Sequence, residues 1–137
     1  TQLYISVSAF DENAFSRICR PHTNNAWKKL NETLELLPSF NCPTVIRFIL
    51  ARNMNLEYPK VFAKLIEKAN PTYLEPKAYM HVGFSRLRLD GSSMPTHKEI
   101  RDFATQLANE TSYNILDESP DSRVVLLSRL EKAIKLA

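Results

Sequence analysis

The sequence predicts a single α/β domain whose sheet is mainly parallel. Apolar patterns of period two alternate along the chain with apolar patterns of helical period, which is typical of strand–helix–strand units. At 137 residues and 44% hydrophobic content, the chain is long enough for one core. The main strands carry polar groups on one face only, whereas central strands of an open doubly wound sheet are apolar on both faces. We therefore expect about half of a (β/α) barrel, because a complete one needs ~250 residues.

The N-terminal part is expected to hold one strand, a short amphipathic turn and one helix. Residues 1–8 alternate between apolar and polar side chains, as a half-buried strand does. Asp11 is placed to cap a short amphipathic turn, and Asn24 or Asn25 is placed to cap a helix that ends before Pro38. The apolar stripe of this helix consists of Trp27, Leu30, Leu34 and Leu37.

Two strands with a helix between them are expected in the middle of the chain. Residues 44–50 are mostly β-branched or aromatic, and residues 72–79 form the next strand. A helix starts near Pro59, where apolar residues recur at helical spacing. The residues of the earlier strand that are expected to pack under helices are Thr44, Ile46, Phe48 and Leu50.

The C-terminal part begins with a polar, loop-like segment at residues 81–95. Thr96 and Glu99 then form a capping-box pattern that opens a helix. Residues 113–116 and 124–127 are short strand candidates. The residues whose spacing predicts a closing helix are Leu130, Ala133, Ile134 and Leu136.

Composition excludes several classes of protein. The only glycines are Gly83 and Gly91, so a Walker loop and a dinucleotide-binding fingerprint are excluded. Cys19 and Cys42 have no partners at metal-ligand spacing, and we expect both to be reduced thiols in a cytoplasmic protein. No apolar run reaches the ~20 residues that cross a bilayer, so no membrane partner is expected. The net charge of +3 is compatible with nucleic-acid binding without demonstrating it.

The most informative segment is 75–86, which starts as a strand with an ionic face. Glu75, Lys77 and Tyr79 are two residues apart and therefore point to the same side. Arg47 in the preceding strand must be paired if it is buried. Its partner is either Glu75 or the carboxylate of a ligand, and both contacts can hold in one network. The alternative for the segment is a solvated edge strand, because its proline is easiest to place on an edge.

Five segments of the chain, taken in order, resemble the 4-demethylwyosine synthases. They are residues 1–9, 44–47, 75–86, 94–97 and 117–127. The resemblance covers nearly the whole chain and is closer to archaeal members than to the flavodoxin-fused eukaryotic ones. It implies the C-terminal half of a partial radical S-adenosylmethionine barrel at residues 1–95. It also implies a wyosine-base-forming extension at residues 96–137, packed on the same core.

The resemblance also implies a reaction. Family members, of the carbon–carbon lyase class, condense N1-methylguanosine of tRNA(Phe) with pyruvate to give 4-demethylwyosine. They use S-adenosylmethionine, a [4Fe-4S] cluster and an external electron donor. The C-x3-C-x2-C motif that holds the cluster is absent from this sequence, so we expect a fragment that is inactive alone. The alternative is a non-catalytic RNA-binding or scaffolding remnant of the fold.

Position and resemblance together give the candidate site residues. Lys77 is the candidate for a Schiff base with pyruvate, a role that pairing with Glu75 would oppose. The residues predicted to line the cofactor site are Ser6, Ser8, Arg47, Asn53, Glu75, Tyr79, Met80 and Val82. The residues predicted to contact the anticodon loop of the tRNA are Arg20, Lys28, Arg86, Arg88 and Lys98. No metal-ligating set is expected.

Each group of candidates also has an ordinary structural explanation. Serine hydroxyls can bond to a neighbouring strand, residues 79–82 can serve core packing, and exposed basic residues can form a solvated face. An isolated half-barrel would expose an apolar edge, so we expect the fragment to self-associate.

Overall fold

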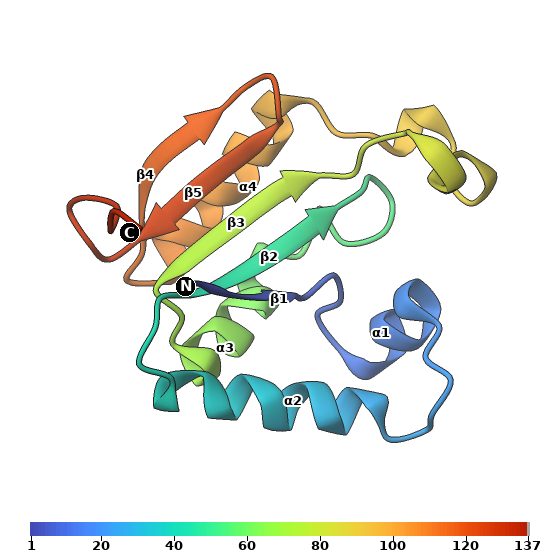
Figure 1. The fold of residues 1–137 in the computed structure, drawn as a ribbon. Helices are drawn as coiled ribbons and strands as arrows, with labels where there is room; N and C mark the ends of the chain where they lie inside the picture. Colours follow the sequence, from blue (N-terminus) through green and yellow to red (C-terminus); the bar gives the residue numbers. More distant parts are fainter. Residues whose placement is uncertain (137) are drawn as a thin grey trace.

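The computed structural model describes residues 1–136 as a sheet with helices packed against one face (Figure 1). The strands are β1 (Leu3–Ser6), β2 (Thr44–Leu50), β3 (Tyr73–Ala78), β4 (Asn114–Ser119) and β5 (Val124–Ser128). The α-helices are α1 (Glu12–Cys19), α2 (Ala26–Leu36), α3 (Pro59–Ala69) and α4 (His97–Glu110). The short 3₁₀ helices are η1 (Leu37–Ser39), η2 (Gly83–Leu87) and η3 (Gly91–Ser93). Over this part of the chain, no helix combines the length and the apolar character needed to cross a membrane.

The sheet is mixed, with strand order β1-β2-β3-β5-β4. β1, β2 and β3 are parallel to one another, and each is followed by at least one helix. β5 runs antiparallel to both of its neighbours, β3 and β4. The predicted α/β class is confirmed, but the parallel arrangement holds only for the first three strands.

The connection between β4 and β5 explains this difference. Residues 120–123 join the two strands, whereas a parallel pair needs a crossover of a dozen or more residues. An antiparallel hairpin is therefore the connection that this length permits. The short interval between the predicted strands at residues 113–116 and 124–127 already indicated an antiparallel hairpin.

The core lies between the sheet and the helices. Ile46, Phe48 and Leu50 of β2 point into it, as expected, and each is at most 1% exposed. The ring of Phe62 in α3 lies 4.9 Å from that of Phe48 and 5.9 Å from that of Phe103 in α4. In Figure 1, β3 and β5 pass in front of α4, which covers the far side of the sheet. The opposite face mixes the polar side chains of Arg47, Glu75 and Lys77 with apolar ones such as Val45 and Tyr73.

Two helices begin with the predicted caps. Asp11 Oδ1 accepts a hydrogen bond from the Ala14 N–H at 2.7 Å, at the start of α1. Thr96 and Glu99 form the predicted capping box: the Thr96 N–H donates to Glu99 Oε2 at 2.8 Å, and the Glu99 N–H donates to Thr96 Oγ1 at 3.3 Å. Asn25 takes the N-cap position of α2, but its side chain makes no capping hydrogen bond.

The closing helix predicted after β5 is wrong. Residues 129–136 contain no helix, and Leu130, Ile134 and Leu136 are 40%, 47% and 51% exposed. A segment this short does not hold a helix unless an apolar face is packed. Instead, the Ile134 N–H donates to the Tyr73 hydroxyl at 2.7 Å. The apolar residues of this segment have helical spacing, but they do not pack against the core.

Candidate functional site

A row of polar side chains crosses the three parallel strands on the face away from the helices. Ser6 of β1 is the register partner of Arg47 of β2, and Arg47 is the register partner of Glu75 of β3. Register partners point to the same side of a sheet. Lys77, two residues beyond Glu75, lies on that face as well. The prediction that these side chains share one face is confirmed, and what they bind stays a prediction.

Arg47 and Glu75 form an ion pair within this row. Arg47 Nη2 and Nε lie 2.6 and 2.8 Å from Glu75 Oε2. The Tyr4 hydroxyl donates to Glu75 Oε1 at 3.0 Å, and burial together with this bond raises the pKa of Tyr4. The Arg47 side chain is 38% exposed and that of Glu75 is 13% exposed. Because only one edge of the guanidinium is engaged, Arg47 keeps donors for an anionic ligand.

Lys77 does not pair with Glu75. Its ammonium group donates to the Ser122 carbonyl at 2.8 Å instead. Both residues line a cavity of about 310 Å³ that we term the ionic hollow. The charged and polar residues that line it include Arg47, Glu75, Lys77, Asp117, Glu118 and Ser122. Lys77 is half-buried.

β4 adds two acidic residues to the lining of the ionic hollow, Asp117 and Glu118, and neither is among the predicted site residues. Asp117 is the register partner of Leu126, which also lines the hollow, whereas the Glu118 carboxylate points to α4 on the other face of the sheet. Glu118 Oε2 lies 2.8 Å from His97 Nε2, and Glu118 also pairs with Arg101. The hydrogen bond from His97 and the charge of Arg101 lower the pKa of Glu118. A bulge at residues 115–117 shifts the register of β4. Simple alternation along the sequence therefore does not show which acidic residue of β4 faces the hollow.

Asn55 ties together the loops that follow β1 and β2. Its side chain is buried, its Nδ2 donates to the Ser8 and Ile49 carbonyls at 2.7 and 2.8 Å, and its Oδ1 accepts from the Ala51 N–H at 2.8 Å. Asn55 therefore fixes the carboxyl end of the sheet. Asn53, a predicted cofactor residue, is exposed in a left-handed conformation with φ of 62°.

The segments that follow all three parallel strands meet at a cavity of about 290 Å³, which we term the arginine pocket. Arg17 and Arg20 come from α1 and its C-terminal end, Met54 from the loop after β2, and Tyr79 and Arg88 from the segment after β3. Figure 1 shows α1, the loop after β2, and η2 and η3 at one end of the sheet. Parallel α/β proteins place their sites at this end. Arg17 was not predicted, although it lies one helical turn before Arg20.

Eight of the predicted site residues line neither cavity. They are Ser6, Ser8, Asn53, Lys28, Lys98, Arg86, Met80 and Val82. Lys28 and Lys98 lie on exposed helix faces, and each pairs with a carboxylate four residues further on, at 3.7 and 2.7 Å. Arg86 Nε donates to a loop carbonyl at 3.2 Å. Met80 is half-buried and Val82 is exposed. The predicted roles of these last five residues find no support in a shared geometry.

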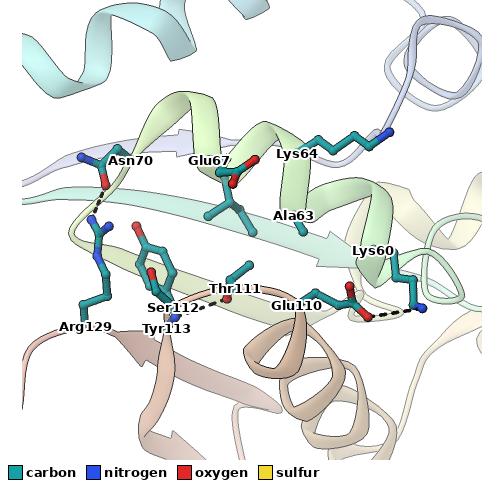
Figure 2. Close-up of a pocket in the computed structure, with 11 residues that line it drawn as sticks. Lys60, Ala63, Lys64, Glu67, Asn70, Glu110, Thr111, Ser112, Tyr113 and Arg129 are labelled. Atoms are coloured by element: carbon teal, nitrogen blue, oxygen red, sulfur yellow. Dashed lines mark hydrogen bonds and ion pairs between the residues drawn. The ribbon is translucent and has the colours of Figure 1, made fainter.

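A larger groove of about 450 Å³ lies between α3 and α4 (Figure 2). Three of its charged side chains already have partners, since Lys60 lies 3.3 Å from Glu110 and Arg129 donates to Asn70. Figure 2 shows these two contacts at opposite ends of the groove. None of the predicted site residues lines it. Its volume alone does not make it the candidate site.

The described residues do not supply ligands for an iron–sulfur cluster. Within residues 1–136, no group of three His, Cys, Asp or Glu side chains is arranged to hold a metal ion. Cys19 and Cys42 are free thiols, one at the end of α1 and the other before β2. A [4Fe-4S] cluster needs several thiolates that converge on one point. This part of the chain therefore does not fit the cluster.

Comparison with known proteins gives a family that is similar to the segment that carries Glu75, Lys77 and Arg88. Residues 68–129 match a family model described as wyosine base formation. We term this part of the chain, which is similar to that family, the wyosine family segment. The wyosine family segment runs from the end of α3 to the end of β5, so it begins before residue 96, the predicted start of the wyosine-forming extension.

Relatives of the wyosine family segment extend the similarity to nearly the whole chain. The S-adenosyl-L-methionine-dependent tRNA 4-demethylwyosine synthase of Pyrococcus abyssi is 42% identical over 130 residues, covering 94% of this chain and 38% of the relative. The protein of that name from Oryza sativa subsp. japonica is 30% identical over 135 residues, covering 96% of this chain and 21% of the relative. A solved structure of TYW1 with a lysine-pyruvate adduct bound has a TM-score of 0.86 at 38% identity, covering 94% of this chain and 41% of that one. The resemblance to archaeal members is confirmed, and the chain spans less than half the length of each of these relatives.

Proposed function

We propose that this chain is part of a tRNA 4-demethylwyosine synthase. The observation that carries the proposal is the 42% identity, over 94% of the chain, to a relative of that name. The reaction of the complete enzyme is the condensation of N1-methylguanosine of tRNA(Phe) with pyruvate to give 4-demethylwyosine, a carbon–carbon lyase reaction. The similarity to a TYW1 structure with a lysine-pyruvate adduct supports pyruvate as the second substrate.

The chain contributes part of a radical S-adenosylmethionine barrel at residues 1–95 and the base-forming extension at 96–137. Helices on one face and an ionic row on the other support this role, because a barrel places its helices outside and its site within. β1 and β4 are the edge strands of the described sheet. A free edge at β1 favours self-association of the fragment, and size-exclusion chromatography with light scattering tests it.

The ionic face is the proposed site for S-adenosylmethionine. Arg47 and Lys77 are the cations that would hold its carboxylate, and Ser6 lies in the same row. Glu75 holds Arg47 in place through the ion pair. When bound, the cofactor supplies the radical that removes hydrogen from the methyl group of the substrate. The residues proposed for its sugar and adenine side, near the carboxyl end of the strands, are Ser8, Asn53, Tyr79, Met80 and Val82.

Lys77 has two possible roles with pyruvate, as a Schiff-base amine or as a cation that binds the carboxylate. Its Nζ donates to the Ser122 carbonyl, and Asp117 lines the same hollow. This contact holds the side chain at the wall of the hollow, where its charge can meet a carboxylate, which favours the second role. Lys77→Arg separates the two, because arginine keeps the charge and forms no imine.

The complete enzyme would take its [4Fe-4S] cluster and the contact with an electron donor from protein outside this chain, since Cys19 and Cys42 do not fit the cluster. The residues proposed to contact the anticodon loop are Arg20, Lys28, Arg86, Arg88 and Lys98. The two lysines already have carboxylate partners, so we expect the arginines to contribute most. A cytoplasmic location fits a tRNA-modifying enzyme and stays a prediction.

The test is a chimera in which this chain replaces the matching segment of the Pyrococcus abyssi relative. With a reductant, S-adenosylmethionine, pyruvate and tRNA that bears N1-methylguanosine, the chimera is expected to form 4-demethylwyosine, detected by nucleoside mass spectrometry. The chain alone is expected not to cleave S-adenosylmethionine. A folded chimera that binds tRNA and forms no product would overturn the proposed activity. That outcome would favour a non-catalytic RNA-binding or scaffolding remnant, which the lack of cluster ligands in residues 1–136 also fits.

A further inference from the structure

We infer that the arginine pocket binds one nucleotide of single-stranded RNA, with the phosphate held by Arg17, Arg20 and Arg88. The choice of RNA as the ligand rests on the proposed function, and the inference deepens it by assigning a built subsite. The pocket is separate from the ionic hollow, because the two cavities share no lining residue. It therefore adds a contact beyond the ionic hollow, and it shares only Tyr79 with the residues proposed for the adenine side of the cofactor.

The three arginines of the pocket have no anionic partner within the described residues. No ion pair reaches Arg17, Arg20 or Arg88, whereas three other arginines each pair with a glutamate. The pocket lining also contains no carboxylate, unlike the ionic hollow and the groove between α3 and α4. Three exposed cationic residues therefore line one cavity without a counter-charge in its lining. Phosphate matches their forked donors.

Arg20 is held in a backbone conformation that favours glycine. It caps the C-terminus of α1 with φ of 47° and ψ of 59°, in the left-handed region. Glycine or asparagine is the usual residue there, and Asn70 takes the equivalent position at the end of α3. Arginine at this position gives up backbone stability and gains a guanidinium at the pocket. The charge of Arg20 can therefore be removed without weakening the helix.

The ordinary explanation for Arg17 and Arg20 is that cations favour the C-terminal end of a helix. It does not account for Arg88, which reaches the same cavity from the segment after η2. It also does not account for the apolar part of the lining. Convergence from two elements that are distant in sequence is what distinguishes a binding site from a solvated helix end.

The apolar part of the pocket favours a nucleotide over a bare phosphate ion. Ile18, Met54 and Leu89 line it beside the buried ring of Tyr79, and a phosphate ion needs none of them. The Tyr79 hydroxyl is fixed between His81 Nδ1 at 3.0 Å and the η2 backbone. A volume of about 290 Å³ lies at the lower end of the range for ligand pockets. This space suits one nucleotide and not two.

The turn beside the pocket displays an aromatic ring to solvent. Phe84 and Leu87 on η2 are 82% and 83% exposed. The turn itself is ordered by Ser85, whose hydroxyl accepts from the Val82 N–H at 3.2 Å. Proteins that bind single-stranded RNA stack unpaired bases on such rings next to arginines. We therefore place the base of the neighbouring nucleotide on Phe84.

The test is a titration of the isotope-labelled 137-residue chain with guanosine 5′-monophosphate, followed by NMR. Shifts are expected at residues 17–20, 79 and 88–89. Arg20→Gly and Arg88→Ala should each weaken binding about tenfold or more, because each removes a charge-assisted bond to phosphate. Lys64→Ala, which removes an exposed charge from the groove between α3 and α4, should change binding less than about twofold. Arg20→Gly should melt no earlier than the parent chain, so lost binding cannot be assigned to unfolding.

Two further ligands distinguish a nucleotide site from an anion site. Guanosine should bind far more weakly than its monophosphate, and inorganic phosphate should compete poorly because it leaves the apolar wall empty. With an anticodon stem-loop RNA, each arginine variant should reduce the dependence of log affinity on log salt by about 0.7. Unchanged affinity in both arginine variants would overturn the inference. The inference would also be overturned if inorganic phosphate competed as well as the nucleotide does, because the pocket would then bind an adventitious ion only.

The chimera separates this inference from the proposed function. If the parent chimera forms product and the Arg20→Gly and Arg88→Ala chimeras match it in turnover and tRNA affinity, the pocket assignment fails and the proposed function stands. If the chain binds the nucleotide through these arginines and the parent chimera forms no product, the proposed function fails and the pocket assignment stands.

Discussion

Arg47 and Glu75 are register partners on adjacent parallel strands, and their side chains meet at 2.6 Å on the sheet face that the helices leave uncovered. The Glu75 carboxylate is the more buried partner and also accepts from the Tyr4 hydroxyl. Removing one member of such a pair leaves the other without its counter-charge, whereas removing both does not. The pair is therefore a structural element of the sheet as well as a candidate ligand contact.

Glu75→Gln is expected to lower the free energy of unfolding by about 1–3 kcal/mol, because Arg47 loses its counter-charge. In a double-mutant cycle with Arg47→Met, the coupling should be about 1–2 kcal/mol, measured by urea denaturation. The control is the pair of Lys28 and Glu32, whose side chains are 79% and 56% exposed. Its cycle should give about 0–0.5 kcal/mol. Equal coupling energies in the two cycles would show that the pair of Arg47 and Glu75 stabilises the fold no more than an exposed ion pair does.

Glu99 is expected to make stability depend on pH in the acid range. The hydrogen bond from Arg52, with those from Thr96, lowers the pKa of Glu99 to about 2. A carboxyl whose folded pKa lies below its ordinary value of 4.5 stabilises the fold above pH 4.5 and loses this contribution as the pH falls toward 2. At pH 7, Glu99→Gln should cost about 1–2 kcal/mol after allowance for solvent screening, since a third of the pair is exposed.

The Glu99 prediction is checked by measuring unfolding of the parent chain and Glu99→Gln between pH 7 and pH 2.5. The difference between them should shrink steadily below pH 4.5. Asp102→Asn, which breaks an exposed pair with Lys98 in the same helix, should stay within about 0.5 kcal/mol of the parent at pH 7. If the difference in free energy of unfolding between the parent chain and Glu99→Gln were the same at pH 7 and at pH 2.5, the lowered pKa of Glu99 would be contradicted.

Local features of the fold could be predicted from the sequence because their causes lie within a few residues. The Asp11 cap and the box of Thr96 and Glu99 each depend on a contact three residues along the chain. Alternation in β2 and β3 placed Arg47 and Glu75 on one face before their register was known. The direction of β5 depends on the length of its connection to β4, and the absence of a closing helix depends on packing. Neither can be predicted from the periodicity of apolar residues.

The arginine pocket could not be predicted because it forms only when distant elements meet. Arg20 and Arg88 were expected to contact RNA in separate basic groups, and the fold brings them to one cavity with Arg17. Spacing on α1 predicts that Arg17 and Arg20 are neighbours, but it does not predict that η2 lies beside them. The ionic hollow likewise needed the bulge in β4 before Asp117 could be placed.

Asp11→Ala is expected to lower the free energy of unfolding by about 1 kcal/mol, because the first turn of α1 loses its side-chain cap. The matched control is Asn25→Ala at the start of α2, where the side chain makes no capping bond. That change should cost less than about 0.5 kcal/mol. Both are measured by thermal unfolding. Equal losses would mean that Asp11 acts through its charge alone rather than through the bond to Ala14.

Asn55→Ala is expected to lower the free energy of unfolding by about 2–4 kcal/mol. The substitution leaves the buried Ser8 and Ile49 carbonyls and the Ala51 N–H without the partners that Asn55 provides. Asn53→Gly is the control two residues earlier, and it should be neutral or slightly stabilising because glycine suits its φ of 62°. Urea denaturation measures both, and NMR should show that only Asn55→Ala disturbs the backbone amides of the loops after β1 and β2. If the two variants were equally stable, the buried asparagine would not hold the carboxyl end of the sheet together.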